Sequence, residues 1–255
     1  MMTRIVVAEV LDGLAERDPS AMRSRRDLRS LHRAMGTRGI VLRSLRATAL
    51  YGRARRAPAP LRVLELGAGD GSLMLGVAGA LRGLWPAVEL TLLDRRDVVE
   101  PSTVARYAER GWSATPLVTD VLAWAANDGN PLRASHAAPP RWDLIVANLF
   151  LHHFEGALLA TLLSAIAART GCFLACEPRR ARVALAGSHL VGLLGANAVT
   201  REDAVTSVHA GFRDREISDL WPAHTAHRTL AETPAGLFSH CFRAERTDDV
   251  MQAAP

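Results

Sequence analysis

A short apolar run that ends in a glycine-rich turn is the feature that most constrains the fold of this chain. Residues 61–66 are mostly apolar, which is typical of a buried strand in a parallel sheet, and glycines follow at positions 67, 69 and 71. Apolar residues of helical spacing come next, at Leu73, Val77 and Leu81. Glycine tolerates positive φ, and the free N–H groups of a new helix face the same point. The stretch predicts a strand, a tight turn and a helix around a ligand-binding cradle.

Further apolar runs end in polar residues and alternate with helical patterns. Strands are predicted at 88–94, 115–119, 142–148 and 172–177, with helices at 71–82, 101–110 and 121–126 and after residue 155. This alternation predicts a parallel, doubly wound sheet, in which ligands bind at the carboxyl ends of the strands. The polar residues expected at that edge are Glu65, Asp94, Asp120, Asn148 and Glu177.

The two ends of the chain complete the predicted α/β fold. A helix is expected at 5–14, broken at 18–20, and two amphipathic helices follow before a proline-containing linker at 57–60. Two runs at 225–231 and 237–244, joined through 233–236, predict a hairpin that supplies an antiparallel last strand to a seven-stranded, mostly parallel sheet. A helical insertion lies between strands five and six, and its start is expected at the capping pattern Thr200–Asp203. The expected units are an N-terminal helical cap (1–56), a Rossmann-like domain (61–246) with an insertion at 179–223, and a loose tail (247–255).

The glycine turn and the acids after the first three strands resemble the S-adenosylmethionine site of class I methyltransferases, over residues 61–178. The resemblance implies S-adenosylmethionine as cofactor, S-adenosylhomocysteine as product, a ribose-binding acid at Asp94 and an adenine-contacting acid at Asp120. Either acid also suits an ordinary helix cap. The cofactor-binding residues that it implies are Glu65, Gly67, Ala68, Gly69, Asp94, Arg95, Asp120, Val121, Asn148 and Leu149.

The residues after the fourth strand bear on the acceptor. Methyltransferases of base or glutamine amino groups resemble one another in an Asn-Pro-Pro-aromatic motif, whereas Leu149 and Phe150 follow Asn148 here. The run 151–154, Leu-His-His-Phe, instead resembles small-molecule methyltransferases that act on quinone, polyketide or other metabolite nuclei. The expected reaction is methylation of a small, largely apolar metabolite of secondary metabolism, at the oxygen of a phenolic or polyketide-like acceptor.

His152 and His153 are the candidate catalytic residues. An imidazole that titrates near neutral pH suits the deprotonation of a phenol, and a structural role in the loop is equally open. Neighbouring histidines on a turn do not easily share one metal ion, and no third ligand has a recognisable spacing, so no metal is expected. The insertion residues Leu190, Leu193, Leu194, Val208 and Phe212 are expected to form apolar walls around the acceptor. The candidate substrate-binding residues are Phe150, Arg179, Arg180, His209 and Phe212, although His209 lies on an apolar stripe that equally suits the core.

Charge leaves two alternatives open. All 31 basic residues are arginine, and residues 22–56 hold eleven of them with one acid, Asp27, so this segment carries +10 in a chain of net charge +5. A solvated helix face is one explanation of this positive charge. The alternative is an RNA-binding protein or RNA methyltransferase, although Tyr51 is the one aromatic residue available there for base stacking.

A nicotinamide-dependent oxidoreductase shares the glycine turn, but Ser72 stands where the third glycine of its motif belongs.

The remaining composition predicts a cytoplasmic protein. The three cysteines, at 172, 176 and 241, lie in apolar surroundings and are expected to be reduced. No membrane span or signal peptide is expected, because Glu9 and Asp12 interrupt the first apolar run. A small-molecule substrate is the expected partner, nucleic acid is disfavoured, and a homodimer is left open.

Overall fold

The computed structural model describes residues 2–15, 17–126, 142–223 and 228–246. The loop expected at 128–140, the first residues of the strand expected at 225–231 and the tail at 247–255 lie outside these residues.

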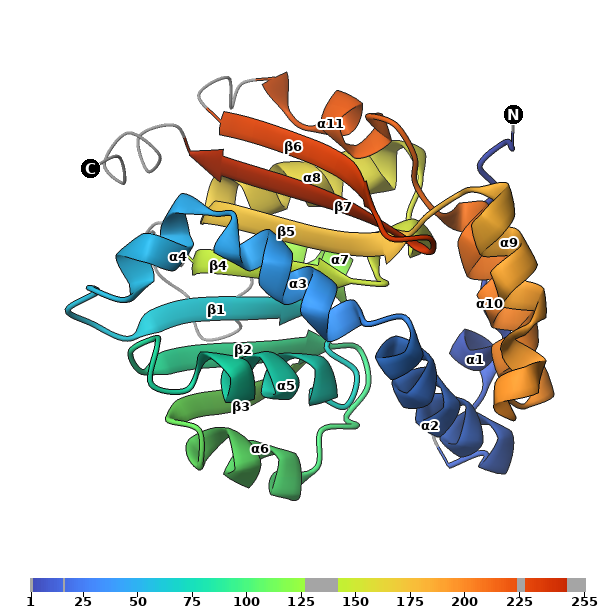
Figure 1. Ribbon diagram of the computed structural model, residues 1–255, viewed down its shortest axis with the longest axis horizontal. Helices are drawn as coiled ribbons and strands as arrows, with labels where there is room; N and C mark the ends of the chain where they lie inside the picture. Colours follow the sequence, from blue (N-terminus) through green and yellow to red (C-terminus); the bar gives the residue numbers. More distant parts are fainter. Residues whose placement is uncertain (1, 16, 127–141, 224–227, 247–255) are drawn as a thin grey trace.

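A seven-stranded sheet forms the centre of the molecule (Figure 1). Its strands follow the order β3-β2-β1-β4-β5-β7-β6, with β1 to β5 parallel and β7 antiparallel to both of its neighbours. This confirms the predicted doubly wound sheet with an antiparallel last strand. Pro116 and Pro234 lie in the edge strands β3 and β6, where a missing N–H is best tolerated. The strands are β1 (Leu61–Leu66), β2 (Val88–Asp94), β3 (Trp112–Val118), β4 (Trp142–Asn148), β5 (Thr170–Pro178), β6 (Arg228–Ala235) and β7 (Ser239–Arg246).

Helices cover both faces of the sheet and bury two apolar cores. One face packs against α3 (Thr37–Arg46), α4 (Ala49–Ala54), α5 (Ser72–Leu81) and α6 (Pro101–Ala108). The other packs against α7 (Val121–Ala126), α8 (Gly156–Arg169) and α11 (Glu216–Leu220). Because strand side chains alternate between faces, Val63 contributes to the first core, and Leu64 to the second. The three cysteines are buried and free, as expected.

The helices before the linker at 57–60 share an apolar core with the sheet that follows it. Ile40, Leu45 and Leu50 belong to the same core as β1 and α5, and each is no more than 5% exposed. The apolar stripes of α3 and α4 are therefore part of the sheet's own helical layer, and the arginines of α3 (Arg38, Arg43 and Arg46) are exposed.

A group of helices lies beside the carboxyl ends of the parallel strands (Figure 1). It comprises α1 (Val10–Gly13), α2 (Pro19–Ala34), α9 (Arg182–His189) and α10 (Ala198–Ala210), with short 3-10 turns η1 (Leu151–His153) and η2 (Val191–Leu194). Helix α10 contacts α1, α2 and α9, which joins the start of the chain to the segment between β5 and β6. The helical insertion expected there is confirmed.

Three local predictions in this group are wrong. The helix expected at 5–14 is only Val10–Gly13, because the residues before it are extended against α10. The break expected at 18–20 instead begins α2, with the Asp18 carboxylate accepting from two N–H groups and proline at the first turn. The N-cap of α10 is Asn197 rather than Thr200, and the Asp203 carboxylate binds the backbone of α1 instead.

Within the described residues, none of the helices is both long and apolar enough to cross a membrane.

Candidate functional site

The turn after β1 brings backbone close to the ends of three strands. Gly67, Gly69 and Gly71 have φ values of +66°, +54° and +72°, which side-chain-bearing residues rarely adopt. A Cβ atom on Gly67 would lie 2.3 Å from Cδ2 of Phe150, so this glycine lets the loop after β4 lie directly on the turn. Around Gly69 no atom lies within 4 Å of the Cβ position, so that part of the turn is open.

Two buried polar atoms beside the turn have no hydrogen-bond partner among the described residues. They are Oε2 of Glu65, at the end of β1, and Oδ1 of Asn148, at the end of β4. Burial and the nearby charges of Asp70 and Asp94 raise the pKa of Glu65 well above its ordinary value. A ligand that presents hydrogen-bond donors or a positive charge would satisfy both atoms, and the amino group of S-adenosylmethionine fits that requirement.

Asp94, the acid predicted to bind the ribose, is hydrogen-bonded to the turn. Asp94 accepts a hydrogen bond from the Gly69 N–H at 2.8 Å and another from the Arg96 N–H at 3.0 Å. Each of its oxygens keeps a second acceptor position for a hydroxyl group. Ala68, also predicted to bind the cofactor, is buried and donates its N–H to Leu93.

The residues predicted after β3 have visible structural roles. The Asp120 side chain accepts from the N–H groups of Leu122 and Ala123, at 2.8 Å and 3.2 Å, and so caps α7. Val121 is buried as the first residue of that helix. The geometry thus displays the capping role of Asp120, and its adenine-binding role stays a prediction.

Glu177, at the end of β5, organises the loop that follows β4. Its fully buried carboxylate accepts hydrogen bonds from the backbone N–H groups of Phe150, Leu151 and His152 and lies 2.9 Å from Nδ1 of His152. Leu149, the first residue of the loop, has φ +50°. The loop conformation is therefore fixed by one acidic side chain from the neighbouring strand.

The two histidines have opposite environments. Burial lowers the pKa of His152, but its hydrogen bonds and ion pairs with Glu177 and Glu9 outweigh burial and raise it to about 9. Burial and the positive charge of His152 both lower the pKa of His153. At neutral pH His152 is a cation between two carboxylates, whereas His153, 26% exposed, is neutral and able to accept a proton.

The ligating atoms of Glu9, His152 and His153 lie within 4.8 Å of one another. Both ring nitrogens of His152 already face carboxylates, however, at 2.9 Å and 3.4 Å. We therefore interpret this cluster as a buried charge network that ties the start of the chain to the loop after β4.

Residues 2–14, called the N-terminal strap below, cross the site. Arg4 donates to the carbonyl groups of Ala210 and Phe154, both at 2.8 Å, and its guanidinium lies 4.4 Å from the centre of the Phe212 ring. The other end of the strap contacts the residues after Asp94. There Arg96 donates to the carbonyl of Asp12 at 2.8 Å, and Arg95, predicted to bind the cofactor, forms an ion pair with the Asp12 carboxylate at 2.6 Å.

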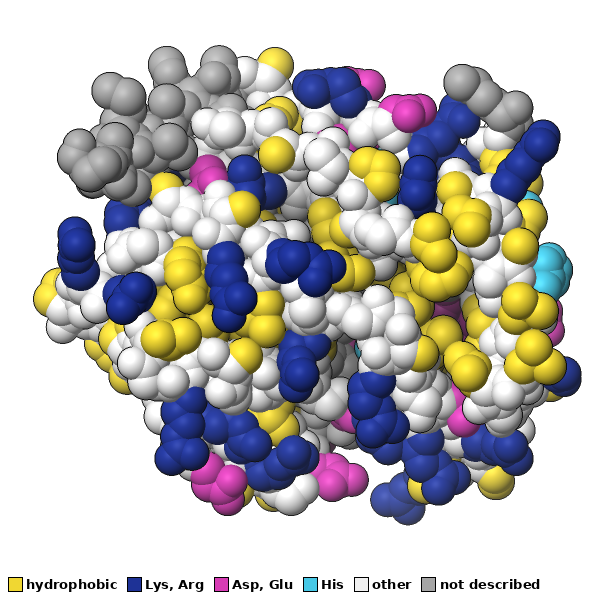
Figure 2. Space-filling model, viewed as in Figure 1, with side chains coloured by type: hydrophobic (Ala, Val, Ile, Leu, Met, Phe, Trp, Pro, Cys, Tyr) yellow, Lys and Arg dark blue, Asp and Glu magenta, His cyan; other side chains and the backbone are white. Residues whose placement is uncertain are grey.

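An apolar cavity of about 330 Å³ lies between α2, α9, η2 and α10. It reaches the sheet at Leu149, which follows β4, and at Pro178, the last residue of β5. Figure 2 shows hydrophobic side chains gathered over this part of the molecule. Four of the five residues expected to wall an acceptor site line the cavity, namely Leu190, Leu193, Leu194 and Val208.

The five predicted substrate-binding residues lie elsewhere. Phe150 lies on Gly67. Phe212 is 1% exposed beneath Arg4, and the backbone carbonyl of His209 accepts from Ile5. The guanidinium of Arg180 binds the carbonyls of Met2 and Gly211 and the carboxylate of Glu216, and that of Arg179 donates to Gly236. The structure thus uses both arginines to hold chain segments together.

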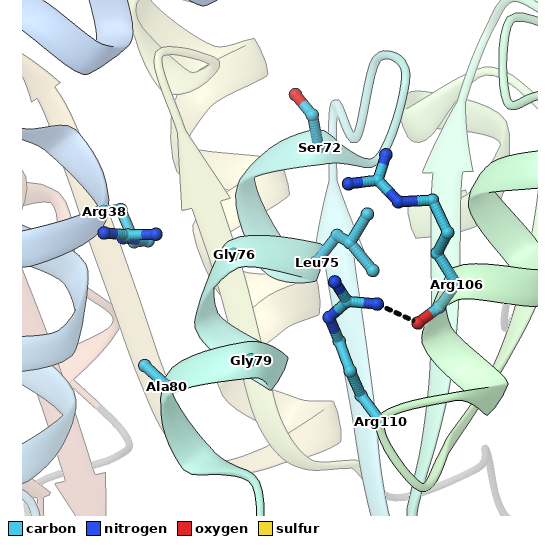
Figure 3. Close-up of a pocket in the computed structure, with 8 residues that line it drawn as sticks. All are labelled: Arg38, Ser72, Leu75, Gly76, Gly79, Ala80, Arg106 and Arg110. Carbon is cyan, nitrogen blue, oxygen red and sulfur yellow. Dashed lines mark hydrogen bonds between the residues drawn. The ribbon is translucent and has the colours of Figure 1, made fainter.

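A second hollow, of about 450 Å³, lies on the outer side of α5. Figure 3 shows Arg38 on one side of α5 and, on the other side, Arg106 from α6 and Arg110 from the turn that follows α6. Among the described residues, no carboxylate forms an ion pair with Arg38 or Arg106. This arginine groove is away from the cavity.

No protein-family model matches the sequence, and no curated protein matches it. Solved structures do resemble it. The plantazolicin methyltransferase BpumL in complex with SAH has a TM-score of 0.59 and 14% identity over 90% of this chain and 91% of that one. An O-methyltransferase family protein from Burkholderia thailandensis has a TM-score of 0.56 and 15% identity over 91% of this chain and 63% of that one.

These two chains share their fold with the present one across nine tenths of its length, and the strand order agrees with it. The chain has the class I methyltransferase fold. In this fold the glycine turn, Glu65, Asp94 and Asn148 lie together at the carboxyl ends of β1, β2 and β4.

Sequence reasoning missed Glu9, Arg4 and the use of Asp203 by the strap. The available signal was weak, because Glu9 and Asp12 interrupt an apolar run without any recognisable motif. Their roles follow from contacts more than 140 residues apart in the chain.

Proposed function

We propose that this protein is an S-adenosylmethionine-dependent methyltransferase whose acceptor is a small, largely apolar metabolite. The observation that carries the proposal is the pair of buried, unpartnered oxygens of Glu65 and Asn148 beside an open glycine turn. The apolar cavity, which reaches the same edge of the sheet at Leu149, supports an apolar acceptor.

The roles of individual residues follow from their positions. Glu65 and Asn148 would bind donor groups of the cofactor. The turn at Gly67 and Gly69 would let the cofactor lie close to the protein backbone, and Asp94 would accept hydrogen bonds from the ribose hydroxyls. When bound, S-adenosylmethionine supplies a methyl group already activated on a sulfonium. The protein then has to align the acceptor and exclude water, which the leucines of η2 and the residues of α10 favour.

Oxygen is the atom that we propose to be methylated, with His153 as the base. A neutral imidazole is able to take the proton of a phenol, and the lowered pKa of His153 keeps it neutral. The variant His153→Ala should lower kcat without changing cofactor affinity, and the loss should shrink for acceptors of lower pKa. Equal losses across acceptors would assign His153 a structural role instead.

Thermal unfolding with separate ligands tests the proposed cofactor. We expect S-adenosylhomocysteine to raise Tm, because a ligand that binds only the native state stabilises it, and NAD and NADP to leave it unchanged. A rise with NAD or NADP alone would instead identify a nicotinamide-dependent oxidoreductase.

The arginine groove favours RNA binding as a second candidate function. Arg38, Arg106 and Arg110 would contact phosphate groups, so RNA affinity should fall steeply with salt and should be lost when all three are changed to serine. Undetectable RNA binding at low salt would remove this candidate. Deleting residues 1–56 is not a usable test, because α3 and α4 belong to the core.

A further inference from the structure

We propose that Glu9 binds the methyl acceptor through its Oε2 atom and selects acceptors that present a positive charge or a hydrogen-bond donor. The inference rests on the proposed function, which makes the apolar cavity the acceptor site.

One oxygen of the Glu9 carboxylate is held by two neighbouring side chains. Its Oε1 atom accepts a hydrogen bond from the Ser207 hydroxyl and lies 3.4 Å from Nε2 of His152. The side chain is 14% exposed and lines the cavity. No described residue hydrogen-bonds its Oε2 atom. The carboxylate is thus held by one oxygen, and the other is available to a ligand.

Glu9 is ionised at neutral pH. Burial raises its pKa, but the hydrogen bond and the positive charge of His152 outweigh burial and lower it. A carboxylate in an apolar cavity, with one oxygen lacking a partner, strongly attracts a donor or cation.

The other polar side chains of the cavity are used within the protein. Ser24 is hydrogen-bonded to Thr200 at 2.8 Å, and Ser188 donates to the Leu185 carbonyl at 2.8 Å. Asp203 accepts from the backbone N–H groups of Val10 and Leu11 at 2.7 Å and 3.0 Å. Glu9 is therefore the side chain best placed to bind a polar group of the acceptor.

The cavity also selects by the sign of charge. Its charged lining residues are Glu9 and Asp203, and no arginine or histidine is among the residues that line it. An acceptor with a carboxylate or phosphate inside this cavity would be repelled, and nothing there would compensate for its lost hydration.

The same contacts orient the acceptor. Glu9 contacts His152 in η1, directly after β4, whereas Leu190, Leu193 and Leu194 line the cavity from the insertion. The donor group of the acceptor therefore lies near the loop after β4, and its apolar body extends toward η2. This places the polar end of the acceptor on the side of the cofactor cradle.

Calorimetry with three probes of equal aromatic body tests the proposal. The probes are 1-naphthylmethylamine, a cation, 1-naphthalenemethanol, a neutral donor, and 1-naphthoate, an anion. Each is titrated into the full-length protein with and without S-adenosylhomocysteine. For the wild type we expect the amine to bind best, the alcohol more weakly and the naphthoate not at all. Any order in which naphthoate equals or exceeds the amine overturns the proposal without the need for a variant.

Two variants assign the preference to Glu9. The variant Glu9→Gln keeps the shape of the side chain and an acceptor for Ser207, and should weaken amine binding by about tenfold or more, since a charge-assisted hydrogen bond is lost. Glu202→Gln, which removes an equal charge from the exposed side of α10, should leave amine affinity unchanged. Unchanged amine affinity in Glu9→Gln, or an equal loss in Glu202→Gln, contradicts the proposal.

The test separates this inference from the proposed function. Binding of S-adenosylhomocysteine without a preference for the amine overturns the role of Glu9 and leaves the methyltransferase proposal intact. An amine preference that depends on Glu9, in a protein that does not bind S-adenosylhomocysteine, supports the ligand-binding role of Glu9 and contradicts the proposed methyltransferase function.

Discussion

Two buried carboxylates at the ends of β1 and β5 differ in what surrounds them. Glu177 accepts hydrogen bonds from three backbone N–H groups and faces the His152 cation, so its charge is satisfied within the protein. Glu65 has one oxygen without a partner and a raised pKa. The first fixes a loop, and the second is available to a ligand.

The raised pKa of Glu65 predicts a pH dependence of cofactor affinity. A donor or cation binds the ionised carboxylate, so affinity for S-adenosylhomocysteine should increase as pH rises above the ordinary titration range of a glutamate and a larger fraction of Glu65 is ionised. Calorimetry at several pH values checks this. In Glu65→Gln, which cannot ionise, affinity should be weaker and independent of pH over these values, and an unchanged slope would contradict the role of Glu65.

His152 predicts a pH dependence of stability. Its pKa is raised to about 9, against about 6.5 in an unfolded chain, so its charge stabilises the fold fully below pH 6.5. That contribution, on the order of 3 kcal/mol, should be lost as pH rises through 9. Urea unfolding of the wild type from pH 6 to 10 should show the decline, and His152→Gln should lack it. Parallel curves for the two proteins would place the pH dependence elsewhere.

The sequence motif predicted where the glycine turn and its acids lie, but long-range contacts decided the rest of the site. Glycines 67 and 69 and Asp94 could be predicted because strand, turn and acid follow one another in the sequence. Glu9 and Arg4 act on residues that only the folded chain brings close. Arginines 179 and 180 looked available for substrate, yet tertiary contacts use their guanidinium groups.

At the scale of secondary-structure elements, the turn after β1 and the loop after β4 depend on each other. Gly67 allows Phe150 to lie on the turn, and Glu177 holds the backbone of Phe150 in place. The strap then covers the loop through Arg4 and Glu9. A substitution in one of these elements should therefore change the affinity for the proposed cofactor.

A pair of glycine substitutions tests this dependence. Gly67→Ala and Gly83→Ala both place a side chain at positive φ, at +66° and +73°, but only the first would contact Phe150. Gly83→Ala should cost about 1 kcal/mol of stability and leave affinity for S-adenosylhomocysteine unchanged. Gly67→Ala should cost more and weaken binding. Denaturant unfolding and calorimetry measure the two effects, and equal behaviour of the two variants would contradict the proposed contact.

At the scale of the whole molecule, the sequence predicted the sheet better than the division into domains. Strands and helices with a clear hydrophobic pattern can be predicted from the local sequence, so β1, β2 and β4 lie where they were expected. The proline linker suggested a boundary, but the apolar sides of α3 and α4 pack under the sheet regardless of that linker. Residues 2–9 of the strap form no helix, because their partners lie on α10 and the loop after β4.

Matched leucine substitutions test the single core. Leu45 is 1% exposed and packs against the sheet, whereas Leu31 on α2 is partly exposed and lines the cavity. Leu45→Ala should lower the free energy of unfolding by about 3 kcal/mol, as for a typical buried leucine, and Leu31→Ala by clearly less. If Leu31→Ala costs as much as Leu45→Ala, the distinction between core and cavity wall is wrong. Urea unfolding measures both.

The central claim, that the glycine turn and its acids hold S-adenosylmethionine, is tested most directly by calorimetric titration with S-adenosylhomocysteine. We predict saturable binding with one site per chain for the wild type. Asp94→Ala should weaken it by about tenfold or more, because the hydrogen bonds from the ribose hydroxyls to a carboxylate are lost. The exposed neighbour Asp97, changed to alanine, should leave the affinity as it is. No binding by the wild type at high micromolar ligand would contradict the claim.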